Sequence, residues 1–325
     1  MTALFRRILV TPLALAVLTV VTACDTSDSA QNPADSRFDA NQYERLIASP
    51  EPDSLEGRWL LIGEGKLQRK ESAYVNNVPR LEEEYQEHFK IRQIVHLRSG
   101  HEGEKMHFIS CDGMGERPVR RKNGRLTTTF GAKANPLTLE VVSNSHMLGN
   151  QIYSENFSDT KSLEYALQIK LHRLAPDAIT LGSAVLQTEL MGLPTTPSSL
   201  LCFSESVGEF TQTNHNKTPE DPEYLQSGAT QRLQVVANTT LDDQDMILDL
   251  AEIRDNLGVK EISASMQLNG KGTEDAIYSF WKRGGGSAPS MDIQFEESTA
   301  EGIKAAFSGK ADTNQAFKGD IQISL

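Results

Sequence analysis

The sequence lacks the short motifs that mark the common enzyme classes. It contains no Gly-x-Ser-x-Gly of a serine hydrolase, no His-Glu-x-x-His of a zinc protease, no phosphate-binding loop and no dinucleotide fingerprint. Ser158 and Lys161 match the Ser-x-x-Lys spacing of penicillin-recognising enzymes, but the companion motifs are missing. The sequence therefore gives no support for catalysis and implies no cofactor, although it leaves open an enzyme of unrecognised type.

Acidic residues outnumber basic ones. The chain of 325 residues carries 32 Lys and Arg side chains against 44 Asp and Glu. Residues 1–23 hold Arg6 and Arg7 and no acid, so the rest has 30 basic and 44 acidic side chains, a formal net charge of −14. This excess of acid argues against nucleic acid as a partner and against adhesion to anionic lipid by charge alone.

Long apolar runs are missing except at the start of the chain. Arg6 and Arg7 precede an apolar run over residues 8–21, which is too short for a comfortable membrane-spanning helix. A basic start followed by such a run is the pattern of an export signal. We therefore expect residues 1–23 to be a signal peptide.

The end of the apolar run reads Val21-Thr22-Ala23-Cys24, which resembles the lipobox of bacterial lipoproteins. The resemblance covers residues 1–25. It implies cleavage before Cys24, a diacylglyceryl group on the Cys24 thiol and an acyl chain such as palmitate on the new amino terminus, enough to anchor a protein stably. The alternative is an ordinary secretory signal with an incidental cysteine. Asp25 resembles the signal that retains enterobacterial lipoproteins at the inner membrane, which implies a position facing the periplasm.

Cysteine is scarce, with three residues in the whole chain. If Cys24 carries lipid, Cys111 and Cys202 remain, and in an oxidising compartment they most simply pair. The loop they close spans about 90 residues, which in the chain-entropy model stabilises the fold by at most about 4 to 5 kcal/mol. The alternative is two separate buried thiols.

Composition and alternation predict an all-β protein in two parts. Residues 24–50 are rich in Asp, Ser, Asn, Ala and Pro, and we expect a flexible tether. Residues 51–208 show the spacing of an antiparallel meander or barrel, with strands expected over 137–142, 151–154, 163–174 and 179–186. Asn123-Gly124 indicates a type I′ hairpin turn.

Gly57-Arg58-Trp59, on the first expected strand, resembles the opening of lipocalin-type barrels. That resemblance implies a barrel that binds a small apolar ligand, with Trp59 plugging its closed end. The alternative is a core tryptophan at the edge of some other β fold.

The segment from Phe89 to Cys111 predicts a hairpin of two half-buried strands. With a loop over 100–103, Leu97 faces Met106 and His96 faces His107. Cys111 then lies on the outer side of the barrel, so a bond to Cys202 would hold a later segment against the barrel's exterior.

His96 and His107 on neighbouring strands, with His101 in the loop, could chelate zinc or copper. Arg92, Arg98 and Lys105 on the same face repel a cation, so a solvated polar face is the better interpretation.

The chain begins a second pattern after residues 209–228, which are polar and contain two prolines. We expect a linker there and a small antiparallel sandwich over 229–325, because apolar and polar residues alternate over 262–268, 291–296 and 303–308. Residues 242–257 are predicted as a helix, although Met246, Leu248 and Leu250 also fit a strand.

Three aromatic residues of the second part, Tyr278, Phe280 and Trp281, could form an exposed lip that contacts a partner, or could pack in the core. Together these features predict a lipid-anchored envelope protein that binds or scaffolds. The partner is a small apolar ligand in the barrel, or a protein or glycan on the sandwich.

Overall fold

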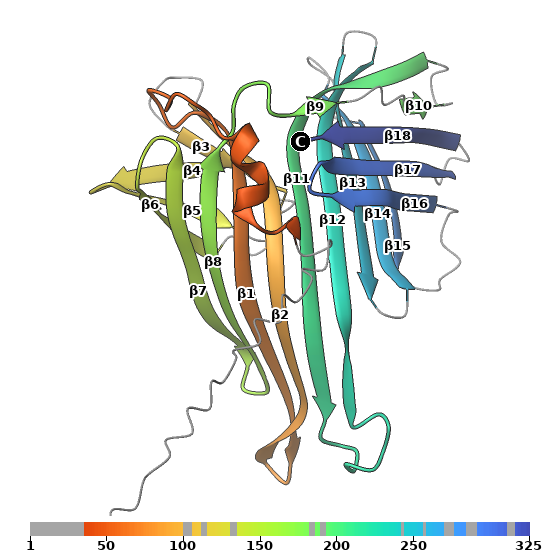
Figure 1. Ribbon diagram of the computed structural model, residues 1–325. Helices are drawn as coiled ribbons and strands as arrows, with labels where there is room; N and C mark the ends of the chain where they lie inside the picture. The colour runs from red at the N-terminus through yellow and green to blue at the C-terminus, as the bar shows by residue number, and fades with distance from the viewer. Residues whose placement is uncertain are drawn as a thin grey trace, which may run out of the picture.

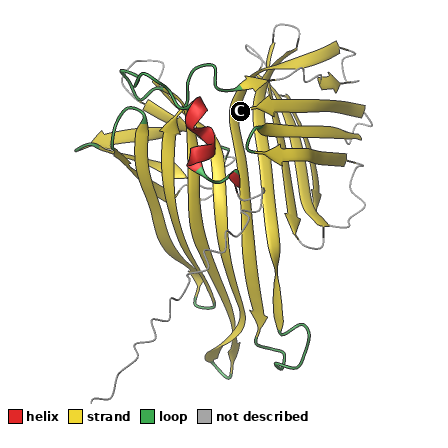
Figure 2. Cartoon of the chain, viewed as in Figure 1, coloured by secondary structure: helices red, strands yellow, loops and turns green. Residues whose placement is uncertain are grey.

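The computed structural model confirms the all-β prediction (Figure 2). It describes residues 36–99, 106–111, 116–130, 135–181, 186–188, 193–241, 244–255, 258–269, 276–283, 291–310 and 316–325. A short 3₁₀-helix, η1 (Ala40–Leu46), precedes the strands.

The first eight strands form the barrel (Figure 1). Each pairs antiparallel with the next, and β8 returns to pair with β1, so the ring closes. Their bounds are β1 (Gly57–Val75), β2 (Val78–Ser99), β3 (Met106–Ile109), β4 (Glu116–Lys122), β5 (Arg125–Phe130), β6 (Asn135–Val141), β7 (His146–Ser158) and β8 (Lys161–Arg173).

The remaining strands build the sandwich. β11 pairs with β2 and carries the sheet on through β12, β13, β14 and β15, while β16, β17 and β18 form a second sheet with the short strands β9 and β10. Their bounds are β9 (Thr180–Leu181), β10 (Leu186–Thr188), β11 (Leu193–Asn214), β12 (Leu225–Leu241), β13 (Gln244–Asp255), β14 (Gly258–Asn269), β15 (Ala276–Arg283), β16 (Met291–Thr299), β17 (Gly302–Lys310) and β18 (Ala316–Ser324).

Two hydrophobic cores share one wall. Successive side chains of a strand point to opposite faces of the sheet. On β1, Trp59 and Leu61 belong to the barrel core, whereas Leu60 and Ile62 belong to the sandwich core. The same strand therefore holds both halves of the molecule together.

The disulfide joins the two halves at a fork in the sheet. One edge of β2 pairs with β11 as far as Ile94, and then with β3 from His96 onward. Cys202 on β11 and Cys111 just after β3 lie on the two sides of this fork, and their sulfur atoms are bonded. The predicted disulfide is confirmed, and it does hold a later segment against the barrel.

Several local expectations are corrected. The end of the expected tether is ordered, because Tyr43 of η1 is buried against the sandwich core. Half of the expected linker over 209–228 is strand, since β11 runs to Asn214 and β12 begins at Leu225. Residues 244–255 form β13 rather than a helix, because β12 and β14 pair with both its edges.

The hairpin register is also corrected. The expected facing pairs Leu97 with Met106 and His96 with His107 are wrong by two residues: Leu97 faces Phe108, His96 faces Ile109 and Arg98 faces His107. More residues separate β2 from β3 than the expected loop contains, so β3 is shifted by two residues along β2. Because side chains alternate with a period of two, this shift leaves the same side chains facing the barrel interior. At Asn123 and Gly124 both φ angles are positive, as the predicted type I′ turn requires.

Candidate binding groove

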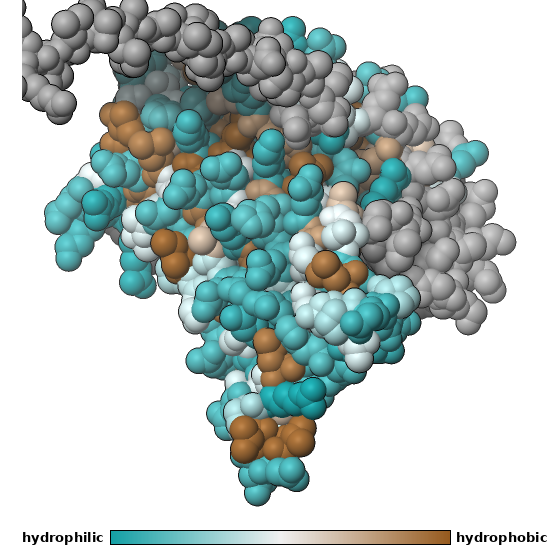
Figure 3. All heavy atoms as spheres, turned by 60° about the horizontal axis from the view of Figure 1, so that its bottom comes forward, coloured by the Kyte–Doolittle hydropathy of each residue, from teal (hydrophilic) through white to brown (hydrophobic). Residues whose placement is uncertain are grey.

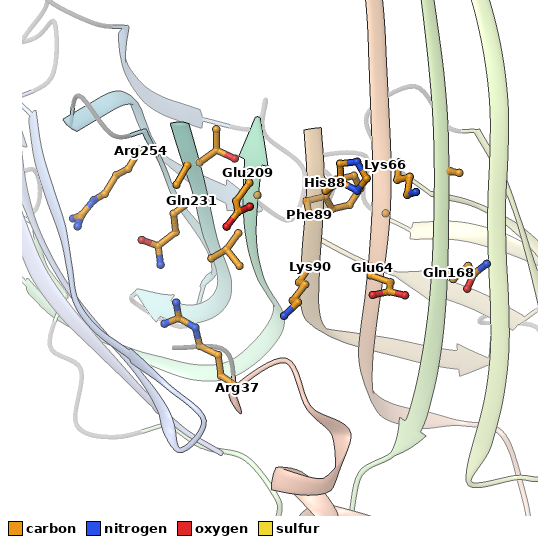
Figure 4. A pocket seen from close by; sticks show the side chains of 16 residues that line it. Arg37, Glu64, Lys66, His88, Phe89, Lys90, Gln168, Glu209, Gln231 and Arg254 are labelled. Carbon is orange, nitrogen blue, oxygen red and sulfur yellow. The ribbon is translucent and has the colours of Figure 1, made fainter. Parts of the chain in front are cut away.

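A groove of about 970 Å³ crosses one face of five adjacent strands, β8, β1, β2, β11 and β12 (Figure 4). Its side chains come mainly from alternate positions that point away from the barrel interior. The groove is lined by Arg37, Glu64, Gly65, Lys66, His88, Phe89, Lys90, Ala166, Gln168, Val207, Gly208, Glu209, Ala229, Thr230, Gln231 and Arg254.

The strand register arranges the groove floor in two rows of directly facing residues. The first row is Ala166, Lys66, His88, Glu209 and Ala229, and the second is Gln168, Glu64, Lys90, Val207, Gln231 and Arg254. Because interior strands of a sheet are fixed by hydrogen bonds on both edges, these side chains hold their spacing without a ligand.

The groove is richer in cations than the protein as a whole. Arg37, Lys66, Lys90 and Arg254 line it together with His88, against two carboxylates, Glu64 and Glu209. The entire chain has a formal net charge of −12. Two of these cations are already paired, Arg37 with Glu205 and Arg254 with Glu252, so the groove and its bonded carboxylates are close to charge balance and less acidic than the chain as a whole.

A buried polar network lies at one end of the groove. Arg92 is fully buried, and its Nε donates to Glu205 Oε2 at 2.8 Å. Its Nη1 donates to the Tyr43 hydroxyl at 2.6 Å and its Nη2 to Ser298 Oγ at 3.1 Å. Arg37 Nη1 lies 3.2 Å from Glu205 Oε1. The network therefore ties η1 to strands from both sheets.

The opposite face of the same strands carries aromatic side chains. Phe89 and Tyr165 pack with ring centroids 5.7 Å apart, and Tyr153 stacks on Tyr165 at 5.0 Å. Burial raises the pKa of the Tyr165 hydroxyl. Leu67, Tyr153 and Tyr165 help to line a second cavity of about 360 Å³ near this end of the barrel.

Glu87 is a buried carboxylate of that face. Arg232 donates to both its oxygens, at 2.8 and 3.2 Å, and the Thr230 hydroxyl donates to Oε1 at 2.7 Å. Burial acts to raise the Glu87 pKa, but the bonds from Arg232 and Thr230 outweigh it, and the pKa is lowered. The neighbouring Tyr85 hydroxyl has a pKa of about 12, raised by burial and by the Glu87 charge.

None of the sequence-predicted site residues that the structure describes lines the groove. Trp59 is fully buried in the barrel core and its Nε1 donates to the Leu55 carbonyl at 3.0 Å. His96 and His107 do not face each other, and His101 lies outside the described residues. The side chains of Tyr278, Phe280 and Trp281 are likewise outside what the structure describes, as is Cys24.

Two histidines form a pair that the sequence reading missed. His146 on β7 faces His172 on β8, with ring centroids 4.9 Å apart. Burial, the His146 ring and Lys170 together lower the pKa of His172 to about 4. Within the described ranges no group of three His, Cys, Asp or Glu residues could hold a metal ion.

In the part of the chain that the structure describes, no helix has the length and apolar character to cross a bilayer.

Comparisons with known proteins define no family. No family model and no curated protein matches the chain. Among solved structures, it is similar to a mutant of transferrin binding protein B from Haemophilus parasuis, with 8% identity, a TM-score of 0.17 and coverage of 82% of this chain and 76% of that one. The outer membrane protein opdK from Pseudomonas aeruginosa has 8% identity, a TM-score of 0.24 and coverage of 82% and 96%. The translocator domain of autotransporter NalP from Neisseria meningitidis has 10% identity, a TM-score of 0.17 and coverage of 91% and 99%.

Proposed function

We propose that this protein is a lipid-anchored binding protein of the cell envelope, facing the periplasm, and that its ligand lies in the groove over β8, β1, β2, β11 and β12. The observation that carries the proposal is the groove itself. Charged and polar side chains from five hydrogen-bonded strands converge there at fixed spacing. A concave site with a few convergent polar groups is the usual form of a ligand site.

The groove supports binding of a polar ligand in preference to an apolar one. Glu64, Lys66, His88 and Lys90 are exposed side chains of its floor. The barrel interior, where a lipocalin-like protein would hold an apolar ligand, is occupied by large side chains such as Trp59 and Phe108, both fully buried.

A second candidate function is binding of a partly apolar ligand in the cavity at the end of the barrel. The cavity of about 360 Å³ is lined by Leu67, Tyr153, Tyr165 and the exposed Ile152, together with polar and charged residues, which are Lys66, Gln68, Gln86, Glu87, His88, Ser154 and Glu164. The aromatic rings can cover the apolar part of a ligand, while the polar residues contact its polar groups.

The anchor rests on the lipobox-like sequence that ends in Cys24. Mass spectrometry of the mature amino terminus tests it: we expect a chain that begins at Cys24 and carries acyl chains. A Cys24→Ser form should lose both the lipid and the membrane attachment. Equal membrane attachment of the two forms would contradict the anchor.

Native mass spectrometry of the full-length protein tests the binding function, by showing whether a small molecule copurifies. Val207 lies at the middle of the second row of the groove floor, so Val207→Trp should fill the groove and remove the ligand. Val75→Trp adds the same ring at an exposed hairpin end and serves as the matched control. Equal ligand occupancy in both variants would contradict the groove as the binding site.

A further inference from the structure

The buried network beside the groove has unequal charges. Arg37 and Arg92 both contact Glu205, whose side chain is fully buried, and no other carboxylate of the described residues bonds to either arginine. Burial, opposed by Arg92, raises the pKa of Tyr43, so its hydroxyl stays neutral at neutral pH. The described network therefore carries one uncompensated positive charge in a place where burial makes such a charge costly.

Arg37 brings that charge to the groove. The residue is 9% exposed and belongs to the groove lining. Its Nη1 is occupied by the Ser298 carbonyl and by Glu205. Its Nε is buried and has no hydrogen-bond partner. Because Nε is shielded, an oxyanion in the groove would approach the guanidinium at its Nη2 end and accept a charge-assisted hydrogen bond there.

We propose that the Arg37 end of the groove binds an oxyanion of the ligand, a carboxylate or a phosphate group. This inference rests on the proposed binding function and specifies the ligand as anionic. An oxyanion at Arg37 supplies the counter-charge that the network lacks. Figure 4 shows the Arg37 guanidinium and the Lys90 ammonium projecting into the same groove.

The structure also predicts that Arg37 can be removed without unfolding the protein. Without it, Arg92 and Glu205 remain as a pair of one cation and one anion, joined at 2.8 Å and each bonded to Ser298. A matched control is Arg45, an exposed arginine of η1 whose loss changes the net charge by the same amount.

Isothermal titration of the full-length protein with inorganic phosphate and, separately, with succinate tests the proposal at low ionic strength. We expect one of the two anions to bind, Arg37→Gln to weaken it at least tenfold, and Arg45→Gln to change it less than twofold. Binding of phosphate alone or succinate alone identifies the preferred anion. Binding of neither anion, or equal losses in the two variants, would overturn the proposal.

A further variant covers a failure of Arg37→Gln to fold. Arg37→Lys keeps the charge but replaces the planar guanidinium, which Glu205 and Ser298 hold in place, by a flexible ammonium, so it should weaken anion binding severalfold; unchanged affinity would overturn the proposal. The result is separable from the wider function. If Val207→Trp loses a copurified ligand but Arg37→Gln binds the anion unchanged, only the anion site at Arg37 is contradicted. If Val207→Trp keeps the ligand but Arg37→Gln loses the anion, only the groove as the ligand site is contradicted.

Discussion

Phe89 on β2 and Tyr165 on β8 pack against each other across the strand between them, because Gly65 of β1 leaves the necessary space. A Cβ atom at position 65 would lie 2.4 Å from Phe89 Cζ. On the other side of β2, Glu87 reaches Thr230 and Arg232 of β12 past Gly208 of β11 in the same way. Two glycines thus let side chains of β2 bridge to strands that are not its neighbours.

Gly65→Ala should therefore destabilise the fold by about 1 to 3 kcal/mol, the usual cost of overpacking a filled site. Urea denaturation measures the change. Phe89→Leu removes the far end of the ring that the new methyl group meets, so the double variant should lose less than the sum of the two single losses. Strictly additive losses would contradict the proposed contact.

The charge balance around Glu205 gives a second prediction. Glu205→Gln leaves Arg37 and Arg92 buried beside each other without a counter-charge, and removal of one partner from a buried ion pair costs about 3 to 5 kcal/mol. Thermal or urea unfolding measures the loss. Exposed Glu223, which pairs with Lys217 in a loop, is the control, and Glu223→Gln should cost less than about 1 kcal/mol. Similar losses in the two variants would contradict the network's structural role.

The disulfide at the fork gives a third prediction. Cys111 and Cys202 are 91 residues apart, so their bond restricts a long loop of the unfolded chain. We expect replacement of both by alanine to lower the free energy of unfolding by about 2 to 4 kcal/mol. Reduction of the unmodified protein should produce a similar loss. A reduced protein with the stability of the oxidised one would show that the bond does not constrain the chain.

The His146 and His172 pair predicts a pH dependence. The pKa of His172 is about 4 in the folded protein, well below the ordinary value for histidine. Both states are neutral at His172 above the ordinary pKa, so its contribution to stability is complete there. As the pH falls toward 4, the unfolded state takes up a proton first and stability is lost. His172→Gln should make the unfolding free energy less steep between about pH 6.5 and 4. An unchanged slope would contradict the assignment.

Several apolar side chains at the hairpin ends are exposed to solvent. Tyr74, Val75 and Val78 of the β1 and β2 hairpin are about half exposed or more, as are Phe157 and Leu225 on other strands. Figure 3 shows apolar residues at the tip that comes forward, set among hydrophilic ones. Val78→Ser should leave the unfolding free energy within about 0.5 kcal/mol, because an exposed side chain loses little on substitution. A larger loss would show that the tip packs against other residues.

The local parts of this fold were predictable from the sequence because alternation and turn signals are local. The strand that contains Leu167, Ile169 and Leu171 and the turn at Asn123 are examples. The packing of η1 against the sandwich core was not predictable, because its residues are mostly polar and only Tyr43 among them is buried. Residues 244–255 were misread because Ile247, Leu250 and Ala251 have the spacing of a helix face, while Leu248 and Leu250 have that of a strand.

The groove could not be predicted because it depends on strand order. Lys66, His88 and Glu209 lie on three separate strands, and nothing local shows that these strands are neighbours. The pairing of β2 with β11 joins residues more than 100 positions apart in the chain. Arg37 was hidden in the segment predicted to be a tether. The predicted disulfide between Cys111 and Cys202 was the only long-range contact that the sequence indicated, and the bond lies beside the fork between β3 and β11.

Amine labelling of the full-length protein, before and after its copurified ligand is removed, tests the groove most directly. Lys66 and Lys90 are exposed side chains of the groove floor, whereas exposed Lys122 lies beside the turn at Asn123, away from the groove lining. The account predicts that acylation of Lys66 and Lys90 rises several-fold when the ligand is removed while that of Lys122 stays constant. Equal labelling of Lys66 and Lys90 in the two states would contradict a ligand in the groove.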